Sequence, residues 1–263
     1  MPLEEIINRQ GIIISAPASG AGKTTVTLGL INAFARRRSV QPFKSGPDYI
    51  DSKFQSVAAD RPSYNLDTWA MSSSEILNMI GMVGTSDICI AEGSMGLFDG
   101  VITKGAGGNG STADLASITN WPVILVVDCA KQAQSVAALI TGFNSFRHDI
   151  TIGGVILNNI SSKRHEALVV SEVSKTKVPI LGVIPRSNEL TIPERHLGLV
   201  QAEDLSDLEQ LIFKLGTLIE ENCDLEAIAC TARNSFPPIS TLQKITPPAQ
   251  RIAIARDNAF TFT

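Results

Sequence analysis

The chain has 263 residues, of which 44% are hydrophobic and 18% are charged, and its formal net charge is -4. This length suits one large α/β domain, or one domain with a fragment of a second. No apolar run approaches the roughly 18 residues of a membrane span, residues 1–10 lack a signal-peptide pattern, and the negative balance disfavours nucleic-acid binding. We therefore expect a cytoplasmic protein that uses neither a membrane nor a nucleic acid.

A short apolar run at residues 11–15 is followed by small residues and then by Gly-Lys-Thr-Thr at 22–25. This order predicts a buried strand, a tight loop and a helix start. In such a loop, backbone N–H groups converge on phosphate oxygens, the lysine adds positive charge, and the first threonine hydroxyl can ligate Mg²⁺. The pattern G-x-x-x-x-G-K-[ST] is broken at its first glycine by Pro17, so the loop must begin differently from the commonest P-loops. The alternative is a glycine-rich turn with an incidental lysine.

A second group of candidate residues follows the next strand. Residues 24–38 have the apolar spacing of an amphipathic helix that ends in three arginines. A short strand from Val40 then leads into a loop; that loop contains Lys44, Asp48, Tyr49 and Asp51. In an open parallel sheet such a loop lies at the carboxyl edge, where ligands bind. A cation and carboxylates there can orient a phosphate, a metal ion and an acidic substrate, whereas the alternative is a solvated turn at Gly46-Pro47.

A third strand, expected at residues 87–91 after a helix from about 72 to 83, ends directly at Glu92. P-loop enzymes place an acid at this position to hold Mg²⁺ or its water. The segment that follows is rich in glycine and contains a further acid, Asp99. A bare turn after the strand is the alternative. The polar cluster at residues 65–67 indicates little by itself.

The rest of the chain continues the β–α alternation, which predicts a doubly wound parallel sheet with right-handed crossovers. Further strands are expected at 122–128, 152–157 and 179–184, and further helices from 111 onward and at about 132–146, 164–174 and 204–221. Where the strand at 152–157 stops, an amide of Asn158 or Asn159 can read a purine edge, or simply form a turn. Arg195 and His196 can neutralise ligand carboxylates, or lie on the surface.

The cysteines and the C-terminal segment suggest no further chemistry. Cys89 and Cys129 are expected as small core residues, because the four cysteines have neither C-x-x-C spacing nor a disulfide-dense context. No metal site of Cys or His is expected. We place the main domain at 1–222, a proline-punctuated linker at 223–250 and the first strand of a further domain at 251–263.

Taken together, these segments resemble the cobyrinic acid a,c-diamide synthase family, which includes the enzymes for hydrogenobyrinic acid. The resemblance covers essentially the whole chain, and its most specific motifs lie at residues 16–25, 43–51, 65–67, 92–100 and 193–199. Pro17 is compatible with this family. The resemblance implies a P-loop fold like that of dethiobiotin synthetase, followed by a glutamine amidotransferase domain whose catalytic Cys, His and Glu are absent from these 263 residues.

The resemblance also implies a reaction and a set of site residues. ATP would phosphorylate the a- and c-acetate carboxylates of cobyrinic acid or a related corrinoid, and ammonia from glutamine would displace the phosphate, in cobalamin biosynthesis. The implied ATP site comprises Ser19, Gly20, Ala21, Gly22, Lys23, Thr24, Thr25, Asn159 and Arg186; the implied Mg²⁺ ligands are Thr24, Asp48 and Glu92. The implied catalytic residues are Lys44, Asp48, Tyr49 and Asp99; the implied substrate contacts are Tyr49, Asp99, Arg195 and His196.

The source of ammonia would be a domain beyond this chain or a separate polypeptide, and a homodimer is left open. Three alternatives remain. Two are enzymes: a nickel-sirohydrochlorin or other tetrapyrrole diamide synthase, and a dethiobiotin-synthetase-like ligase. The third is a nucleotide-switched partner protein of the cell-division ATPase type, which carries an extra P-loop lysine where this chain has Ala18.

Overall fold

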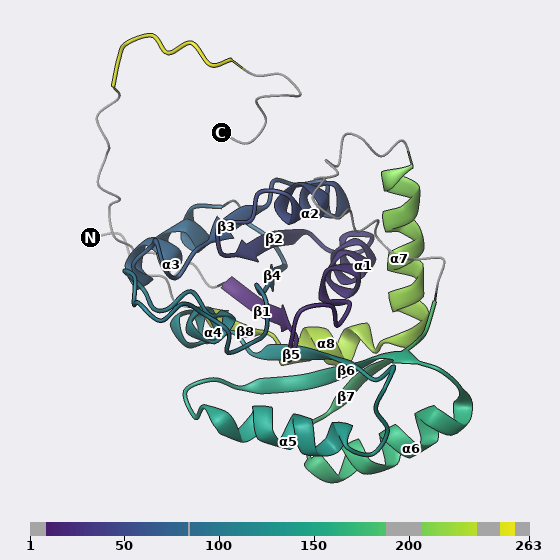
Figure 1. Ribbon diagram of the computed structural model, residues 1–263. Coiled ribbons are helices and arrows are strands. Elements are labelled where there is room, and N and C mark those ends of the chain that lie inside the picture. Colours follow the sequence, from purple (N-terminus) through teal and green to yellow (C-terminus); the bar gives the residue numbers. More distant parts are fainter. Residues whose placement is uncertain (1–8, 84, 188–206, 236–247, 256–263) are drawn as a thin grey trace, which may run out of the picture.

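The computed structural model describes residues 9–83, 85–187, 207–235 and 248–255. Within these ranges the chain forms an eight-stranded sheet with helices on both faces (Figure 1). The strands are β1 (Arg9–Ser15), β2 (Val40–Ser45), β3 (Tyr64–Leu66), β4 (Ile88–Glu92), β5 (Val123–Asp128), β6 (Ile152–Ile160), β7 (Ile180–Pro185) and β8 (Arg233–Ser235). The helices are α1 (Lys23–Ala35), α2 (Asp51–Ala59), α3 (Ser73–Met82), α4 (Thr112–Thr119), α5 (Val136–Phe146), α6 (Lys163–Val173), α7 (Leu208–Asn222) and α8 (Leu225–Thr231), with a short 3-10 turn at Ser174–Thr176.

The strand order places β4 between β2 and β1, and this decides where the site lies. The order is β3-β2-β4-β1-β5-β6-β7 with all neighbours parallel, while β8 pairs antiparallel with the start of β1. The register aligns Glu92 with Lys44 on one side and with Ile14 on the other. The doubly wound parallel sheet is therefore confirmed, and its carboxyl edge brings Lys44, Glu92 and the end of β1 together.

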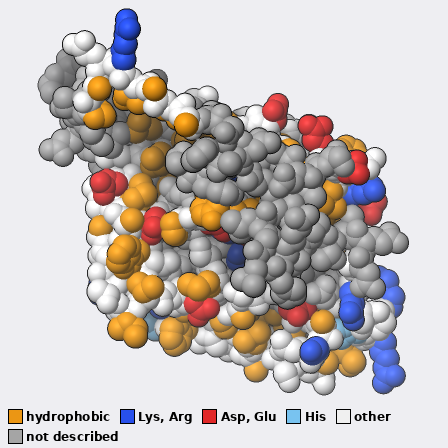
Figure 2. Space-filling view, turned by 45° about the horizontal axis from the view of Figure 1, so that its top comes forward, with side chains coloured by type: hydrophobic (Ala, Val, Ile, Leu, Met, Phe, Trp, Pro, Cys, Tyr) orange, Lys and Arg blue, Asp and Glu red, His pale blue; other side chains and the backbone are white. Residues whose placement is uncertain are grey.

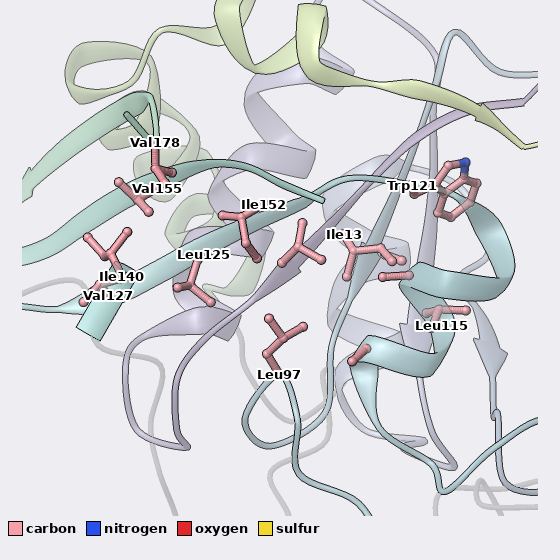
Figure 3. Close-up of a cluster of buried hydrophobic side chains, with 14 of the residues drawn as sticks. Ile13, Leu97, Leu115, Trp121, Leu125, Val127, Ile140, Ile152, Val155 and Val178 are labelled. Carbon is pink, nitrogen blue, oxygen red and sulfur yellow. The ribbon is translucent and has the colours of Figure 1, made fainter. Parts of the chain in front are cut away.

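Two hydrophobic cores hold the layers together, one on each face of the sheet. Strand β1 supplies both, because Ile13 faces one core whereas Ile12 and Ile14 face the other. The first core lies under α3, α4, α5 and α6 and includes Trp121 (Figure 3), and the second lies under α1, α2, α7 and α8. Cys89 and Cys129 are free thiols buried in the first core, as expected.

Several helix boundaries follow from local capping. Ser72 and Glu75 form a reciprocal capping box at the start of α3, and the Ser111 side chain accepts a hydrogen bond from Asp114 N at the start of α4. No described helix is long and apolar enough to cross a membrane. On the face shown in Figure 2, acidic and basic side chains are interspersed among apolar ones, so the described surface there has no uniform charge.

Helix α2 and strand β3 were not among the elements expected from the sequence. β3 has only three residues, too few for an alternating pattern to be recognised, and it is specified by its pairing with β2. Strand β6 also runs further than predicted, through Asn158 and Asn159 to Ile160. Neighbouring strands on both sides supply its hydrogen bonds.

The prediction of a linker from residue 223 is wrong for residues 225–235. Asp224 N donates to Leu181 O at 2.9 Å, Ile228 is fully buried, and β8 extends the sheet next to β1. Residues 251–255, expected to begin a strand, have no regular secondary structure and are exposed. A strand needs a neighbour to satisfy its backbone, and no strand of the described chain pairs with this segment.

The arginines at the end of the first helix also have a structural partner. Arg36 Nη1 lies 2.6 Å from Glu220 Oε2, and its guanidinium stacks on the Phe213 ring. Arg38 Nη2 lies 2.7 Å from Glu226 Oε2. These residues therefore join α1 to α7 and α8.

Candidate active site

The loop between β1 and α1 has the backbone shape of a phosphate-binding loop. Gly20 and Gly22 have φ angles of +78° and +82°, a region that glycine enters without strain. Gly22 precedes α1, and no side chain caps the first turn of that helix. The N–H groups there are free for an anion, as at other helix N-termini that bind phosphate.

Asn158, near the carboxyl end of β6, holds this loop in place through a side-chain hydrogen bond. Its Nδ2 donates to Ala21 O at 2.9 Å. A Cβ at position 22 would lie 2.3 Å from the same nitrogen, so only glycine fits there without displacing the amide. The strand-end amide thus supports the loop, a role that the sequence analysis did not foresee.

Glu92 is the centre of the site. It is fully buried, and its Oε1 accepts hydrogen bonds from Thr24 Oγ1 at 2.8 Å and from Lys23 Nζ at 3.1 Å. Its Oε2 accepts from Gln55 Nε2 at 2.7 Å. Burial by itself raises the pKa of Glu92, but Lys44 and Lys23 outweigh burial, and the pKa falls to about 2. Glu92 is therefore an anion at neutral pH.

Lys44 is the second charged group of the site and is only 2% exposed. Its Nζ lies 2.5 Å from Asp51 Oδ2, 3.1 Å from Glu92 Oε1 and 3.7 Å from Asp48 Oδ2. Burial lowers the pKa of Lys44, but Glu92 and Asp51 more than compensate, so the pKa is raised overall. The pKa of Asp51 rises to about 6, because burial and then the charge of Glu92 outweigh the attraction of Lys44.

Asp48 both faces Lys44 and begins α2. Its Oδ1 accepts hydrogen bonds from Ile50 N at 2.9 Å and Asp51 N at 3.0 Å. Its carbonyl oxygen accepts from Asn65 Nδ2 at 2.6 Å, and the same nitrogen donates to Gly46 O at 2.7 Å. Asn65, from the cluster that indicated little in the sequence, thus fixes the loop between β2 and α2.

The other expected site residues lie around this cluster. Tyr49 follows Asp48 and is 46% exposed. Asp99 is exposed on the loop after β4, and its Oδ2 accepts from Gly96 N at 2.9 Å. A Cβ on Gly96 would lie 2.6 Å from both Asp99 Oδ2 and Pro17 O, so this loop packs closely against the start of the P-loop. Arg195 and His196 lie outside the described residues.

Asn159 and Arg186 lie beyond the β5 side of the P-loop. Asn159 has a φ of +60°, and its Nδ2 donates to Asp128 Oδ1 at 2.9 Å. Arg186 follows β7 and is exposed. It lines a hollow of about 650 Å³ that also includes Ser161, Ser162, Lys163 and Glu166, from the loop after β6 and the start of α6.

The donor atoms suit a magnesium ion held together with phosphates. The described residues contain no group of three or more His, Cys, Asp or Glu side chains that could hold a metal ion. Mg²⁺ in phosphoryl-transfer sites usually takes only one or two carboxylates and completes its shell with phosphate oxygens and water. The Thr24 hydroxyl and the Glu92 carboxylate, 2.8 Å apart, provide such a pair.

Sequence reasoning missed Gln55, and it did not foresee the supporting roles of Asn65 and Asn158. Asn65 was noted only as part of a motif, and Asn158 only as a candidate for reading a purine edge. Each is a neutral amide, which carries no charge pattern that a motif search would detect. A usable indication for Gln55 was its position, one helical turn after Asp51.

A parallel sheet whose first strand enters a glycine-turned loop and a helix, with a buried acid on the adjacent strand, defines a P-loop nucleotide-binding domain. Residues 12–200 match the model of the family described as the CobQ/CobB/MinD/ParA nucleotide binding domain. The chain belongs to this family.

Among curated proteins, the chain is similar to hydrogenobyrinate a,c-diamide synthases. It is 46% identical to that of Rhodobacter capsulatus over 254 residues and 44% identical to that of Brucella anthropi over 258 residues. Each match covers 96% of this chain and 58% of the relative, so the chain spans less than two thirds of those proteins. The MinC:MinD cell division protein complex of Aquifex aeolicus matches with a TM-score of 0.50 and 16% identity, over 84% of this chain and 93% of that one. This last likeness concerns the fold alone.

Proposed function

We propose that this chain is the ATP-dependent synthetase part of a cobyrinate or hydrogenobyrinate a,c-diamide synthase, acting in cobalamin biosynthesis. The observation that carries the proposal is that Lys23 and Thr24, which follow the P-loop glycines, and Lys44 of β2 converge on the buried Glu92 at the end of β4. The identity of 43–46% to hydrogenobyrinate a,c-diamide synthases supports the choice of reaction.

The reaction has two chemical steps. A carboxylate oxygen of the corrinoid attacks the γ-phosphorus of ATP, the bond to the bridging oxygen breaks, and ADP leaves. Ammonia then attacks the carbonyl carbon of the acyl phosphate, loses a proton and expels phosphate, which leaves an amide. The phosphate is needed because a carboxylate itself is a poor acyl electrophile.

The nucleotide side of the site is assigned from the P-loop and its neighbours. The loop from Ser19 to Thr25 holds the phosphates, with Lys23 near the β- and γ-phosphates. Thr24 and Glu92 would hold Mg²⁺, with Asp48 as a further ligand, and the ion would neutralise charge on the phosphate oxygens. Lys44 stabilises the transferring phosphoryl group.

The two lysines would change partners when nucleotide binds. In the structure Lys23 and Lys44 neutralise the Glu92 carboxylate. A triphosphate brings several negative charges to the same place and can attract both ammonium groups, which leaves Glu92 to the metal ion. These ion pairs thus keep a buried carboxylate compensated.

The remaining roles are assigned by position. Arg186 lines the hollow beyond β6 and β7, which has room for an adenine. Asn159 directly precedes Ile160, which also lines this hollow, and we assign it to the base on that ground. Tyr49 and Asp99 are exposed on the loops after β2 and β4, where they would face the carboxylate being activated, and Arg195 and His196 would contact other substrate carboxylates. We propose that ammonia comes from glutamine through a further domain or a separate polypeptide. A homodimer is left open.

An assay with ammonium tests the proposal without needing a glutaminase. The chain is incubated with ATP, Mg²⁺, ammonium chloride and either cobyrinic or hydrogenobyrinic acid, and phosphate and the corrinoid mass are followed. We expect one phosphate per amide formed, and loss of both products with Lys23→Ala. Phosphate release without amide, or stimulation only by a protein or membrane, would instead favour a nucleotide switch. Turnover only of another tetrapyrrole or of a dethiobiotin precursor would favour the corresponding related ligase.

A further inference from the structure

Gln55 is a fully buried residue of α2, and its side-chain amide points toward Glu92. Its Nε2 donates to Glu92 Oε2 at 2.7 Å, and its Oε1 accepts from Ser63 Oγ at 2.8 Å. The P-loop chemistry described above assigns no role to this hydrogen bond.

The orientation of this amide is decided by Glu92. If the amide were flipped, its oxygen would lie against the Glu92 carboxylate, and two acceptors would meet without a proton. The Ser63 hydroxyl satisfies the amide oxygen at the other end, and the backbone of Ser63 is held because Ser63 N donates to Ser56 Oγ at 2.9 Å. Phe54 and Ala58 anchor the same helix in the hydrophobic core.

The two oxygens of Glu92 have different kinds of partner. Oε1 faces the charged groups of Lys23 and Lys44, together with the Thr24 hydroxyl. Oε2 faces Gln55. A phosphate attracts an ammonium group electrostatically, whereas it attracts a neutral amide donor much less, so the amide keeps its bond to the carboxylate. Gln55 can thus hold the plane of the carboxylate while the partners of Oε1 change.

We propose that Gln55 is a positioning residue that keeps Glu92 Oε1 directed at the Thr24 hydroxyl, and thereby sets the affinity for the divalent cation bound with the nucleotide. The proposal rests on the proposed function only as far as the site binds a metal–nucleotide complex. It does not depend on which carboxylate is phosphorylated. Partners of metal ligands typically change metal affinity by about 10- to 100-fold when they are removed.

The test uses Gln55→Met, which keeps the length of the side chain but removes the donor, and Gln41→Met as the matched control. Gln41 is also a buried amide, in β2, but it donates to the carbonyl oxygens of Pro42 and Pro62 and does not touch Glu92. Mn²⁺ is titrated into each protein with a non-hydrolysable ATP analogue, and free Mn²⁺ is measured by electron paramagnetic resonance. Thermal unfolding of each variant is measured alongside.

We expect Gln55→Met to weaken Mn²⁺ binding by about 10- to 100-fold, with the affinity for metal-free nucleotide nearly unchanged. Gln41→Met should lose thermal stability but keep the Mn²⁺ affinity. Ser63→Ala, at a partly exposed position, removes only the hydroxyl that is bonded to the Gln55 oxygen, so it should weaken Mn²⁺ binding less than Gln55→Met does. It also provides the measurement should Gln55→Met fail to fold.

Two negative outcomes have different meanings. If the wild-type protein binds no Mn²⁺–nucleotide complex, the proposed function itself fails. If the wild type binds it and Gln55→Met or Ser63→Ala binds it equally well, only the positioning role of Gln55 is overturned. Equal weakening in Gln41→Met would also overturn that role, because it would show a general effect of losing a buried amide.

Discussion

Replacing Lys44 by methionine tests whether the charges of the site compensate one another as the distances indicate. Lys44 lies within 4 Å of three carboxylates, of which Glu92 is fully buried. Removing one partner of a buried ion pair leaves an uncompensated charge and costs about 3–5 kcal/mol. We therefore expect Lys44→Met to lower the free energy of unfolding at pH 7.5 by about that amount, measured by urea denaturation.

The pH dependence gives a second, independent expectation. Lys44 lowers the folded pKa values of both Glu92 and Asp51, so both rise without it, and that of Asp51 already lies above its ordinary value. A carboxyl with a raised folded pKa binds its proton more tightly when folded, so stability increases as the pH falls through that value. Because one pKa unit corresponds to about 1.4 kcal/mol, a deficit of about 3–5 kcal/mol equals roughly 2–4 units shared among the carboxylates. The deficit of Lys44→Met should therefore shrink from pH 8 to pH 5.

Two controls distinguish charge compensation from packing. Lys23→Met removes a lysine that pairs with Glu92 but is more exposed, so its loss of stability should be smaller. Adding Glu92→Gln to Lys44→Met should restore part of the loss, because the buried charge is then gone. The reasoning is refuted by two results together: Lys44→Met lowers the free energy of unfolding by less than about 1 kcal/mol, as loss of an exposed ion pair would, and this loss of stability is the same at every pH.

Two further predictions concern the loop and the acids. Gly22→Ala should lower the free energy of unfolding by about 1–3 kcal/mol and abolish nucleotide binding in calorimetry, because the site needs φ +82° and a Cβ there would meet Asn158 at 2.3 Å. Position 20 has φ +78° but open space around a Cβ, so Gly20→Ala should bind nucleotide more strongly than Gly22→Ala does. Equal binding by the two variants would contradict the role of Asn158. Asp51 has a folded pKa of about 6, above its ordinary value. Its contribution to stability therefore grows as the pH falls from 7 to 5, a gain that Asp51→Asn should remove in urea titrations; an unchanged slope in the variant would argue against the shift.

The chain's local patterns were sufficient for the elements that carry the nucleotide chemistry. Gly22, Lys23 and Thr24 are consecutive, so their joint role depends only on a strand that enters a helix. Glu92 was recognisable because an acid directly after a buried apolar strand must lie at the edge of the sheet. The buried run of β5 was also evident, since a strand covered on both faces is continuously apolar.

Residues whose role depends on a distant partner were missed or misplaced. Gln55 and Asn65 are ordinary polar residues until the pairing of β2 with β3 and β4 brings them to Glu92 and to the loop at Asp48. Residues 225–235 were read as part of a linker because prolines follow them. Their helix and strand are instead held by contacts with β7 and β1, which lie far away in the sequence.

The sequence by itself determined that the chain alternates strands and helices, and it indicated the loop, the lysines and the acid that we propose bind a nucleotide. These features depend on backbone conformations and apolar spacing over a few neighbouring residues. Only the tertiary structure decided that β4 lies between β2 and β1, so that one buried carboxylate receives two lysines, a threonine and a glutamine from three different elements. Strand order and register arise from packing across the whole sheet, and no short segment of the sequence contains that information.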